Sequence, residues 1–272
     1  MRYAICNEMF EDWDFAKICE TASELGYTGL EVAPFTLATL ITDVSVSARQ
    51  AMRQTAESSG MQIIGLHWLL AKTTGFHLTS PEAAVRKRTG DYLAELARGA
   101  ADLGGDILVL GSPAQRKIPI GFTRDQAEAF ALQTLQHCLP VLEQTGVKLC
   151  LEPLTPLETD FMLNASEAVG IINKLQHPNV KLHLDVKAMS TEAQLAPDVI
   201  RENSAYTYHF HANDPTDPPR YGPGYGTYDL TPCFAALRET NYAGWVSVEV
   251  FHYAPDPVSI ARRAINYMRS CE

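Results

Sequence analysis

The chain has 272 residues, of which 46 % are hydrophobic and 20 % charged, and 22 basic against 32 acidic side chains give a net charge of −10. This length and composition are typical of a globular protein, and they exclude a disordered, collagen-like or coiled-coil chain. The negative charge argues against a surface for nucleic-acid phosphates or anionic lipid, so we expect neither nucleic acid nor a membrane as a partner.

The N-terminal segment MRYAICNEMFEDWDF carries acidic residues at once and has no apolar core of signal-peptide length. No run of eighteen apolar residues occurs anywhere, which argues against a membrane span. The six cysteines form no CxxC pair, and Cys150 lies in an apolar run where a buried thiol is expected. These features predict a cytoplasmic protein without a disulfide framework.

Eight short apolar runs rich in β-branched residues alternate along the chain with longer segments whose apolar residues recur at helical spacing. The runs predict strands at 3–6, 29–32, 62–69, 106–110, 148–151, 180–184, 206–211 and 245–249. The longer segments predict helices at 15–25, 46–59, 81–103, 124–145, 166–175, 230–240 and 257–270 and, from the weakest pattern, at 197–203. Four of the predicted helices end at a glycine just before a strand, which is typical of helix termination.

This alternation indicates a parallel sheet, because a strand that returns in the same direction needs a helical crossover. Dividing 272 residues among eight units gives about 34 residues each, the size of one strand–helix step. The predicted fold is therefore α/β, a single domain over residues 1–272 that forms a closed (β/α)8 TIM barrel. The alternative is a doubly wound open sheet, which usually has a glycine-rich turn after its first strand, whereas Asn7, Glu8 and Met9 stand there.

Four consecutive predicted strands end on a residue that can bind a metal ion. We call Glu152, Asp185, His211 and Glu249 the rim residues, because the carboxyl ends of barrel strands meet at one rim. Three carboxylates without a cation would repel one another and raise their pKa values, and a divalent ion removes that repulsion. The oxygen-rich donor set favours Mn²⁺, with Mg²⁺, Co²⁺ or Zn²⁺ as alternatives. Each residue alone is also compatible with an ordinary ion pair.

Three further histidines are predicted near this rim. His209 and His183 share strand faces with His211 and Asp185 but lie deeper, so they either support the metal ligands or belong to the barrel core. His67 ends the third predicted strand, where a contact with a substrate hydroxyl and a hydrogen-bonded interior histidine are both compatible with its position.

Two loops after strands carry additional candidates. Glu158 lies six residues beyond Glu152, and the long loop NDPTDPPRYGPGYGTYD carries Arg220 and three tyrosines, which we interpret as a lid over a pocket. Aromatic residues near the strand ends are candidates for the apolar walls of that pocket: Phe10, Trp13, Phe35, Trp68 and Phe251.

As a set, the segments LEPLTPLETDF, KLHLDVKAM, YHFHAND, PGYG and VSVEVF resemble the sugar isomerase/epimerase superfamily with a xylose-isomerase-like TIM barrel, over essentially the whole chain. Ketose 3-epimerases, hydroxypyruvate isomerase, inosose isomerases and dehydratases, and abasic-site endonucleases share this fold. The resemblance implies that the rim residues hold one metal ion and that Glu152 and Glu249 also move protons. It further implies that Glu158 binds substrate.

The chain departs from the ketose 3-epimerase pattern where the sugar is recognised. Ala188, beside Lys187, stands in place of a histidine, and Asp217 stands in place of an arginine, the nearest arginine being Arg220. The missing metal-binding histidines of the abasic-site endonucleases, together with the negative charge, argue against DNA repair. The candidate substrate-binding residues are Glu158, His67, His209, His183, Lys187, Arg220 and Trp68.

Together these residues predict a metal-dependent enzyme that moves a proton next to the carbonyl of a keto sugar or keto-glycoside. One of Glu152 and Glu249 would remove the proton to give a metal-bound enediolate, and the other would return it, so that the substrate is epimerised or isomerised. The alternatives are a dehydratase or lyase of a keto sugar or inosose, and a carbohydrate-binding protein without activity. By analogy alone, the resemblance also implies a homodimer or homotetramer.

Overall fold

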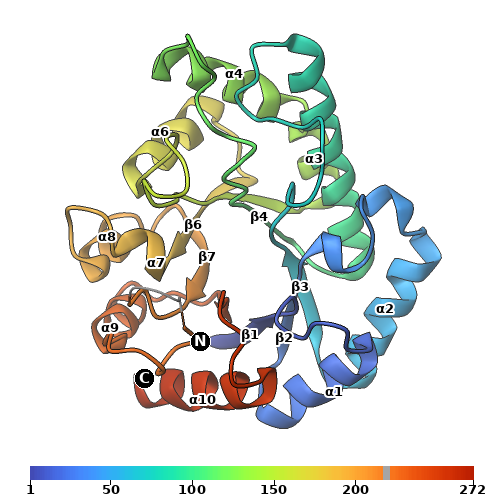
Figure 1. The fold of residues 1–272 in the computed structure, drawn as a ribbon, viewed down its shortest axis with the longest axis vertical. Coiled ribbons are helices and arrows are strands. Elements are labelled where there is room, and N and C mark those ends of the chain that lie inside the picture. Colours follow the sequence, from blue (N-terminus) through green and yellow to red (C-terminus); the bar gives the residue numbers. More distant parts are fainter. Residues whose placement is uncertain (217–220) are drawn as a thin grey trace.

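The computed structural model describes residues 1–216 and 221–272, and its eight parallel strands close into a barrel (Figure 1). Neighbouring strands pair in chain order, and β1 pairs with β8 to close the ring. The strands are β1 (Arg2–Cys6), β2 (Gly29–Val32), β3 (Gln62–Leu66), β4 (Ile107–Leu110), β5 (Lys148–Leu151), β6 (Val180–Asp185), β7 (Thr207–Ala212) and β8 (Trp245–Val248). The predicted (β/α)8 TIM barrel is confirmed, and the open-sheet alternative is wrong.

The helices surround the barrel (Figure 1). They are α1 (Phe15–Leu25), α2 (Val46–Ser58), α3 (Ala83–Leu103), α4 (Arg124–Gln136), α5 (Leu139–Thr145), α6 (Ala165–Leu175), α7 (Val186–Met189), α8 (Ala196–Glu202), α9 (Thr231–Glu239) and α10 (Pro257–Ser270), with 3-10 turns at η1 (Pro34–Thr36) and η2 (Ile41–Asp43). Side chains cap several of them: Thr123 and Gln126 form a capping box at α4, and Asn164 caps α6. No helix among the described residues is long and apolar enough to cross a bilayer.

Two predicted elements have different bounds in the structure. The predicted helix at 124–145 is two helices, because Pro140 has no N–H to continue the first helix and stands instead in the first turn of α5. The predicted strand at 62–69 ends at Leu66, because Trp68 adopts a left-handed backbone conformation with φ of +54°. His67 therefore lies immediately beyond β3.

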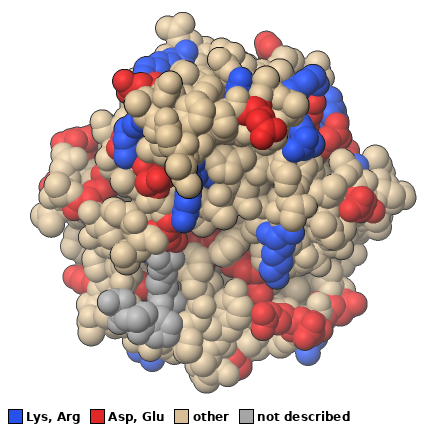
Figure 2. Space-filling view, turned by 45° about the horizontal axis from the view of Figure 1, so that its top comes forward, with Lys and Arg blue, Asp and Glu red and all other residues tan. Residues whose placement is uncertain are grey.

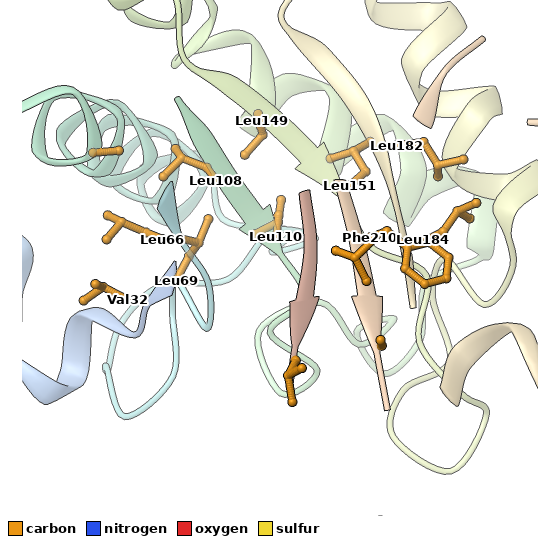
Figure 3. Packing of buried hydrophobic residues seen from close by; sticks show 14 of the residues in the cluster. Val32, Leu66, Leu69, Leu108, Leu110, Leu149, Leu151, Leu182, Leu184 and Phe210 are labelled. Carbon is orange, nitrogen blue, oxygen red and sulfur yellow. The ribbon is translucent and has the colours of Figure 1, made fainter. Parts of the chain in front are cut away.

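The face shown in Figure 2 is hollowed near its centre, and acidic side chains are visible within the hollow beside basic ones. The interior of a TIM barrel is filled with side chains. Successive side chains of each strand point alternately into the barrel and towards the helices. One set of strand residues faces the helices and forms the main core, as Figure 3 shows for Leu108, Leu110, Leu149, Leu151, Leu182, Leu184 and Phe210.

The alternate residues of the strands face into the barrel. A smaller apolar cluster lies there, formed by Ala4, Ile64, Ile107, Val109, Cys150 and Trp245. The residues that follow on the same strand faces, towards the carboxyl ends, are polar and buried, His183, His209 and Glu31 among them. The barrel interior thus changes from apolar to polar along the strands. All six cysteines are buried free thiols.

Candidate active site

The rim residues converge inside the barrel. Glu152, Asp185 and His211 come together with His183, and one donor atom from each of these four lies within 4.8 Å of the others. Glu249, just beyond β8, approaches the same group: its Oε2 lies 3.4 Å from His211 Nδ1, and Asp185 Oδ2 lies 3.9 Å from that nitrogen. The four strand ends therefore deliver their side chains to one place, as their spacing predicts, and His183 belongs to the same group.

Burial and mutual proximity change the proton affinities of these groups. Burial, followed by the neighbouring Glu249 carboxylate, raises the pKa of Glu152 to about 8. Burial would also raise the pKa of Glu249, but His211, His67 and Lys187 outweigh it and hold that pKa well below its usual range. Without a metal ion, the two carboxyl groups thus favour opposite protonation states.

The same side chains fit a divalent cation. His211 Nδ1, Glu249 Oε2 and both ring nitrogens of His183 are buried, and none has a hydrogen-bond partner among the described residues. Buried polar atoms are rarely left in this state unless something else binds them. The buried cluster of histidine, glutamate and aspartate is therefore consistent with a metal site.

Glu31 lies at the candidate site, although the sequence analysis did not predict it. It lies on β2 with no exposed surface, and its Oε2 is 2.8 Å from His209 Nε2 and 3.1 Å from His211 Nε2. Burial would raise the pKa of Glu31, but the two imidazoles outweigh it and hold the pKa well below its usual range. An ionised carboxylate only accepts hydrogen bonds, so both Nε2 atoms donate and His211 Nδ1 is left to face Asp185 and Glu249.

Replacing Glu31 by glutamine is expected to weaken metal binding about 10- to 100-fold. The amide places an N–H₂ donor beside imidazole N–H groups, which favours the tautomer of His211 with its proton on Nδ1. Metal titration gives the affinity, and ¹⁵N chemical shifts of the imidazoles give the tautomer. An unchanged affinity with Nε2 still protonated would contradict this role for Glu31.

A pocket opens directly beside the cluster. Among the residues that line it are the proposed acid–base pair and four predicted substrate-binding residues: Glu152, Glu249, His67, Trp68, Glu158 and Lys187. Gly111, just beyond β4, also lines it, and a Cβ at that position would overlap the Glu152 carboxylate. Glycine at the end of this strand therefore leaves room for Glu152.

Two residues from the end of β3 hold Glu249 in place. Trp68 Nε1 donates a hydrogen bond to Glu249 Oε1 at 2.8 Å, and His67 Nδ1 lies 3.3 Å from the same oxygen. On its other side, His67 Nε2 lies 2.9 Å from Glu8 Oε2. Burial would lower the pKa of His67, but Glu8 and Glu249 outweigh it and raise the pKa to about 10. Because Trp68 and His67 both contact Oε1, the other carboxylate oxygen of Glu249, Oε2, remains directed at His211.

Lys187 brings a buried cation to the pocket. Its Nζ lies 3.1 Å from Glu158 Oε1 and 4.6 Å from the centre of the Phe251 ring. Burial would lower the pKa of Lys187, but the surrounding carboxylates, Asp185 and Glu152 foremost, outweigh it and raise the pKa. The ammonium group partly balances the acidic residues of the pocket.

The remaining predicted site residues lie elsewhere. His183 and His209 do not line the pocket. His183 is part of the cluster, and His209 contacts Glu31. Arg220 lies outside the described residues. The three tyrosines of its loop, Tyr221, Tyr225 and Tyr228, are not among the residues that line the pocket, and the Tyr221 ring lies 5.3 Å from the His252 ring.

The sequence matches the xylose isomerase-like TIM barrel family over residues 19–271, and the chain belongs to this family. A D-psicose 3-epimerase from Ruminiclostridium cellulolyticum is 26 % identical over 247 residues, which cover 89 % of this chain and 80 % of the relative. A 3-dehydro-D-guloside 4-epimerase from Escherichia coli is 32 % identical over 139 residues, covering 49 % of this chain and 51 % of the relative.

Solved structures agree on the fold. The crystal structure of a 3-keto-D-glucoside 4-epimerase from E. coli superposes with a TM-score of 0.86 over all of both chains, at 19 % identity. A D-psicose 3-epimerase crystallised in the presence of D-fructose gives a TM-score of 0.85 at 22 % identity, covering 100 % of this chain and 99 % of the other. The match to the family model confirms the resemblance predicted from the sequence motifs. The relatives named above are sugar epimerases, which are enzymes.

Proposed function

We propose that the chain is a divalent-metal-dependent isomerase or epimerase of a keto sugar or keto-glycoside, with Glu152 and Glu249 as its acid–base pair. The observation that carries this proposal is the position of the two glutamates. They reach one pocket from the ends of β5 and β8, beside a buried cluster of side chains that could hold a metal ion. The names of the relatives, D-psicose 3-epimerase and fructoselysine 3-epimerase among them, support a sugar substrate.

The rim residues would hold one metal ion. The donor set of three carboxylates and an imidazole favours Mn²⁺, with Mg²⁺, Co²⁺ and Zn²⁺ as alternatives, and the soft thiolate ligands that zinc often takes are absent from this set. When bound, such an ion polarises a carbonyl and an adjacent hydroxyl of the substrate and so acidifies the C–H group between them.

The residues of the chain would direct where the proton goes. Glu249 is fixed by Trp68 and His67, and Glu152 occupies the space that Gly111 leaves. If one glutamate removes the proton and the other returns one to the opposite face, the carbon is epimerised. If a single glutamate returns the proton to the neighbouring carbon, the substrate is isomerised.

Lys187 and Glu158 are proposed to bind substrate oxygens. They form an ion pair at the wall of the pocket, so a hydroxyl that enters can donate to the carboxylate and accept from the ammonium group. This pair would replace the sugar contacts of the ketose 3-epimerase pattern that the chain lacks. Residues 1–272 acting as one domain, a cytoplasmic location, and a homodimer or homotetramer remain predictions.

The test is a panel of ketohexoses, ketopentoses and 3-keto-glycosides incubated with the protein and Mn²⁺, Mg²⁺ or Co²⁺. The proposal predicts metal-dependent conversion of at least one compound into an epimer or isomer of the same mass. A product that has lost water would instead identify a dehydratase. Binding without conversion of any compound, with or without metal, would contradict the proposed activity.

A further inference from the structure

A second and larger cavity lies beside the pocket. We call it the groove, and it has a volume of about 620 Å³, with walls formed by residues that follow β1, β2, β3 and β8. Trp68 lines both the groove and the pocket. Its ring centre lies 5.9 Å from that of Phe251 in the pocket and 6.1 Å from that of Phe35 in the groove. One tryptophan thus stands between two adjoining spaces at the same rim.

Aromatic rings form one part of the lining of the groove. Phe10, Trp13, Phe35 and Tyr253 line it together with Trp68, and the Phe10 and Trp13 ring centres are 5.4 Å apart. The aromatic walls expected from the sequence therefore divide between two spaces, because Phe251 belongs to the pocket alone. Broad aromatic faces pack well against the C–H faces of a pyranose or similar ring.

Polar and charged side chains form the rest of the lining that a sugar could meet, and one of them, Lys72, places its Nζ 4.1 Å from the centre of the Phe35 ring. Glu8 is 5 % exposed, and its Oε1 has no hydrogen-bond partner among the described residues, while its Oε2 faces His67. Glu11 and Asp12 line the groove from exposed positions. Carboxylates only accept hydrogen bonds when ionised, so they suit the hydroxyl donors of a sugar ring.

A free ketohexose in the pocket would leave this space unused. We propose that the groove is a subsite for a second hydroxylated ring, so that the substrate is a keto sugar linked to another ring and not a free ketohexose. This inference rests on the proposed function, because it places the reacting ring in the pocket beside Glu152 and Glu249. The attached ring would cross Trp68 and stack on the aromatic wall of the groove.

The experiment compares kcat/KM for a free ketohexose and for a keto disaccharide with the reactive ketone on one ring, using the metal-loaded protein. We expect the disaccharide to be preferred, and Trp13→Ala and Phe35→Ala each to lower the ratio of the two kcat/KM values about 3- to 10-fold. Phe122→Ala is the matched control, since this exposed ring packs against Phe130 and lines neither space, and its ratio should equal that of the wild type. A preference for the free ketohexose, or an unchanged ratio in both groove variants, would overturn the proposal.

Binding separates failure of this inference from failure of the proposed activity. If no sugar is converted, saturation-transfer NMR with Mg²⁺ and the same keto disaccharide still tests the groove. Contact with both rings in the wild type, lost for the second ring in Trp13→Ala, would support the subsite although the reaction is wrong. Contact with one ring only, or unchanged contact in the variant, would overturn the subsite. Thermal melting of each variant shows whether it is folded.

Discussion

Replacing Glu152 by glutamine is expected to lower kcat by about 10²- to 10⁴-fold, the usual contribution of a positioned acid or base. Glutamine keeps the shape that fits beside Gly111 and still offers an oxygen to a cation, but it neither takes nor gives a proton at neutral pH.

The measurement is kcat and KM on the substrate that the panel identifies, together with metal content and melting temperature. Glu143→Gln, at an exposed position on α5, is the matched control and should behave like the wild type. The expected result is a loss confined to kcat, with metal still bound. Near-normal turnover by Glu152→Gln would show that the two-glutamate scheme is wrong.

Removing divalent metal with a chelator is expected to lower activity by at least about 100-fold, and Mn²⁺ or Co²⁺ should restore it. Metal at about 100 times its Kd should also stabilise the fold by about 2.7 kcal/mol, which a melting curve detects. The physical reason is that Glu152, Asp185 and His211 lie close together with Glu249 beside them, and that His211 Nδ1 and Glu249 Oε2 are buried without a hydrogen-bond partner among the described residues. His211→Ala should abolish both effects, whereas His137→Ala, at an exposed position, should abolish neither.

The affinity for metal is expected to rise with pH. Glu152 has a raised pKa of about 8, so below that pH it carries a proton that the incoming cation must displace. One displaced proton makes the affinity about tenfold higher for each pH unit up to about 8, where the contribution of Glu152 levels off. His211, whose pKa lies well above its usual value, adds a further release of the same sign. Isothermal titration in buffers of different pH measures this slope, and a pH-independent affinity would contradict it.

The fold and the rim residues are predictable because both follow from local sequence patterns. Strand and helix spacing repeats eight times, and a strand in a parallel barrel delivers its last residue to the same rim each time. His211, Asp185 and their partners could therefore be assigned without any long-range information. Local exceptions were harder: Pro140 divides a continuous helical pattern, and the backbone of Trp68 ends β3 early.

The second layer of the site could not be found in this way, because it depends on contacts across the barrel. Glu31 meets His209 although the two are 178 residues apart, and Glu8 meets His67 from the end of another strand. The only local signal for Glu31 is a carboxylate within a buried apolar run, GLEV. Buried acids within predicted strands of a barrel are therefore candidates for residues that orient metal ligands.

The central claim is that Glu152 and Glu249 move a proton on a carbon next to a carbonyl. Its most direct test is turnover in D₂O with metal-loaded protein, followed by removal of the metal and mass spectrometry of substrate and product. The account predicts one solvent deuterium on the reacting carbon of the product, and its loss in Glu152→Gln. An epimer formed without any solvent deuterium, or full incorporation by Glu152→Gln, would contradict it.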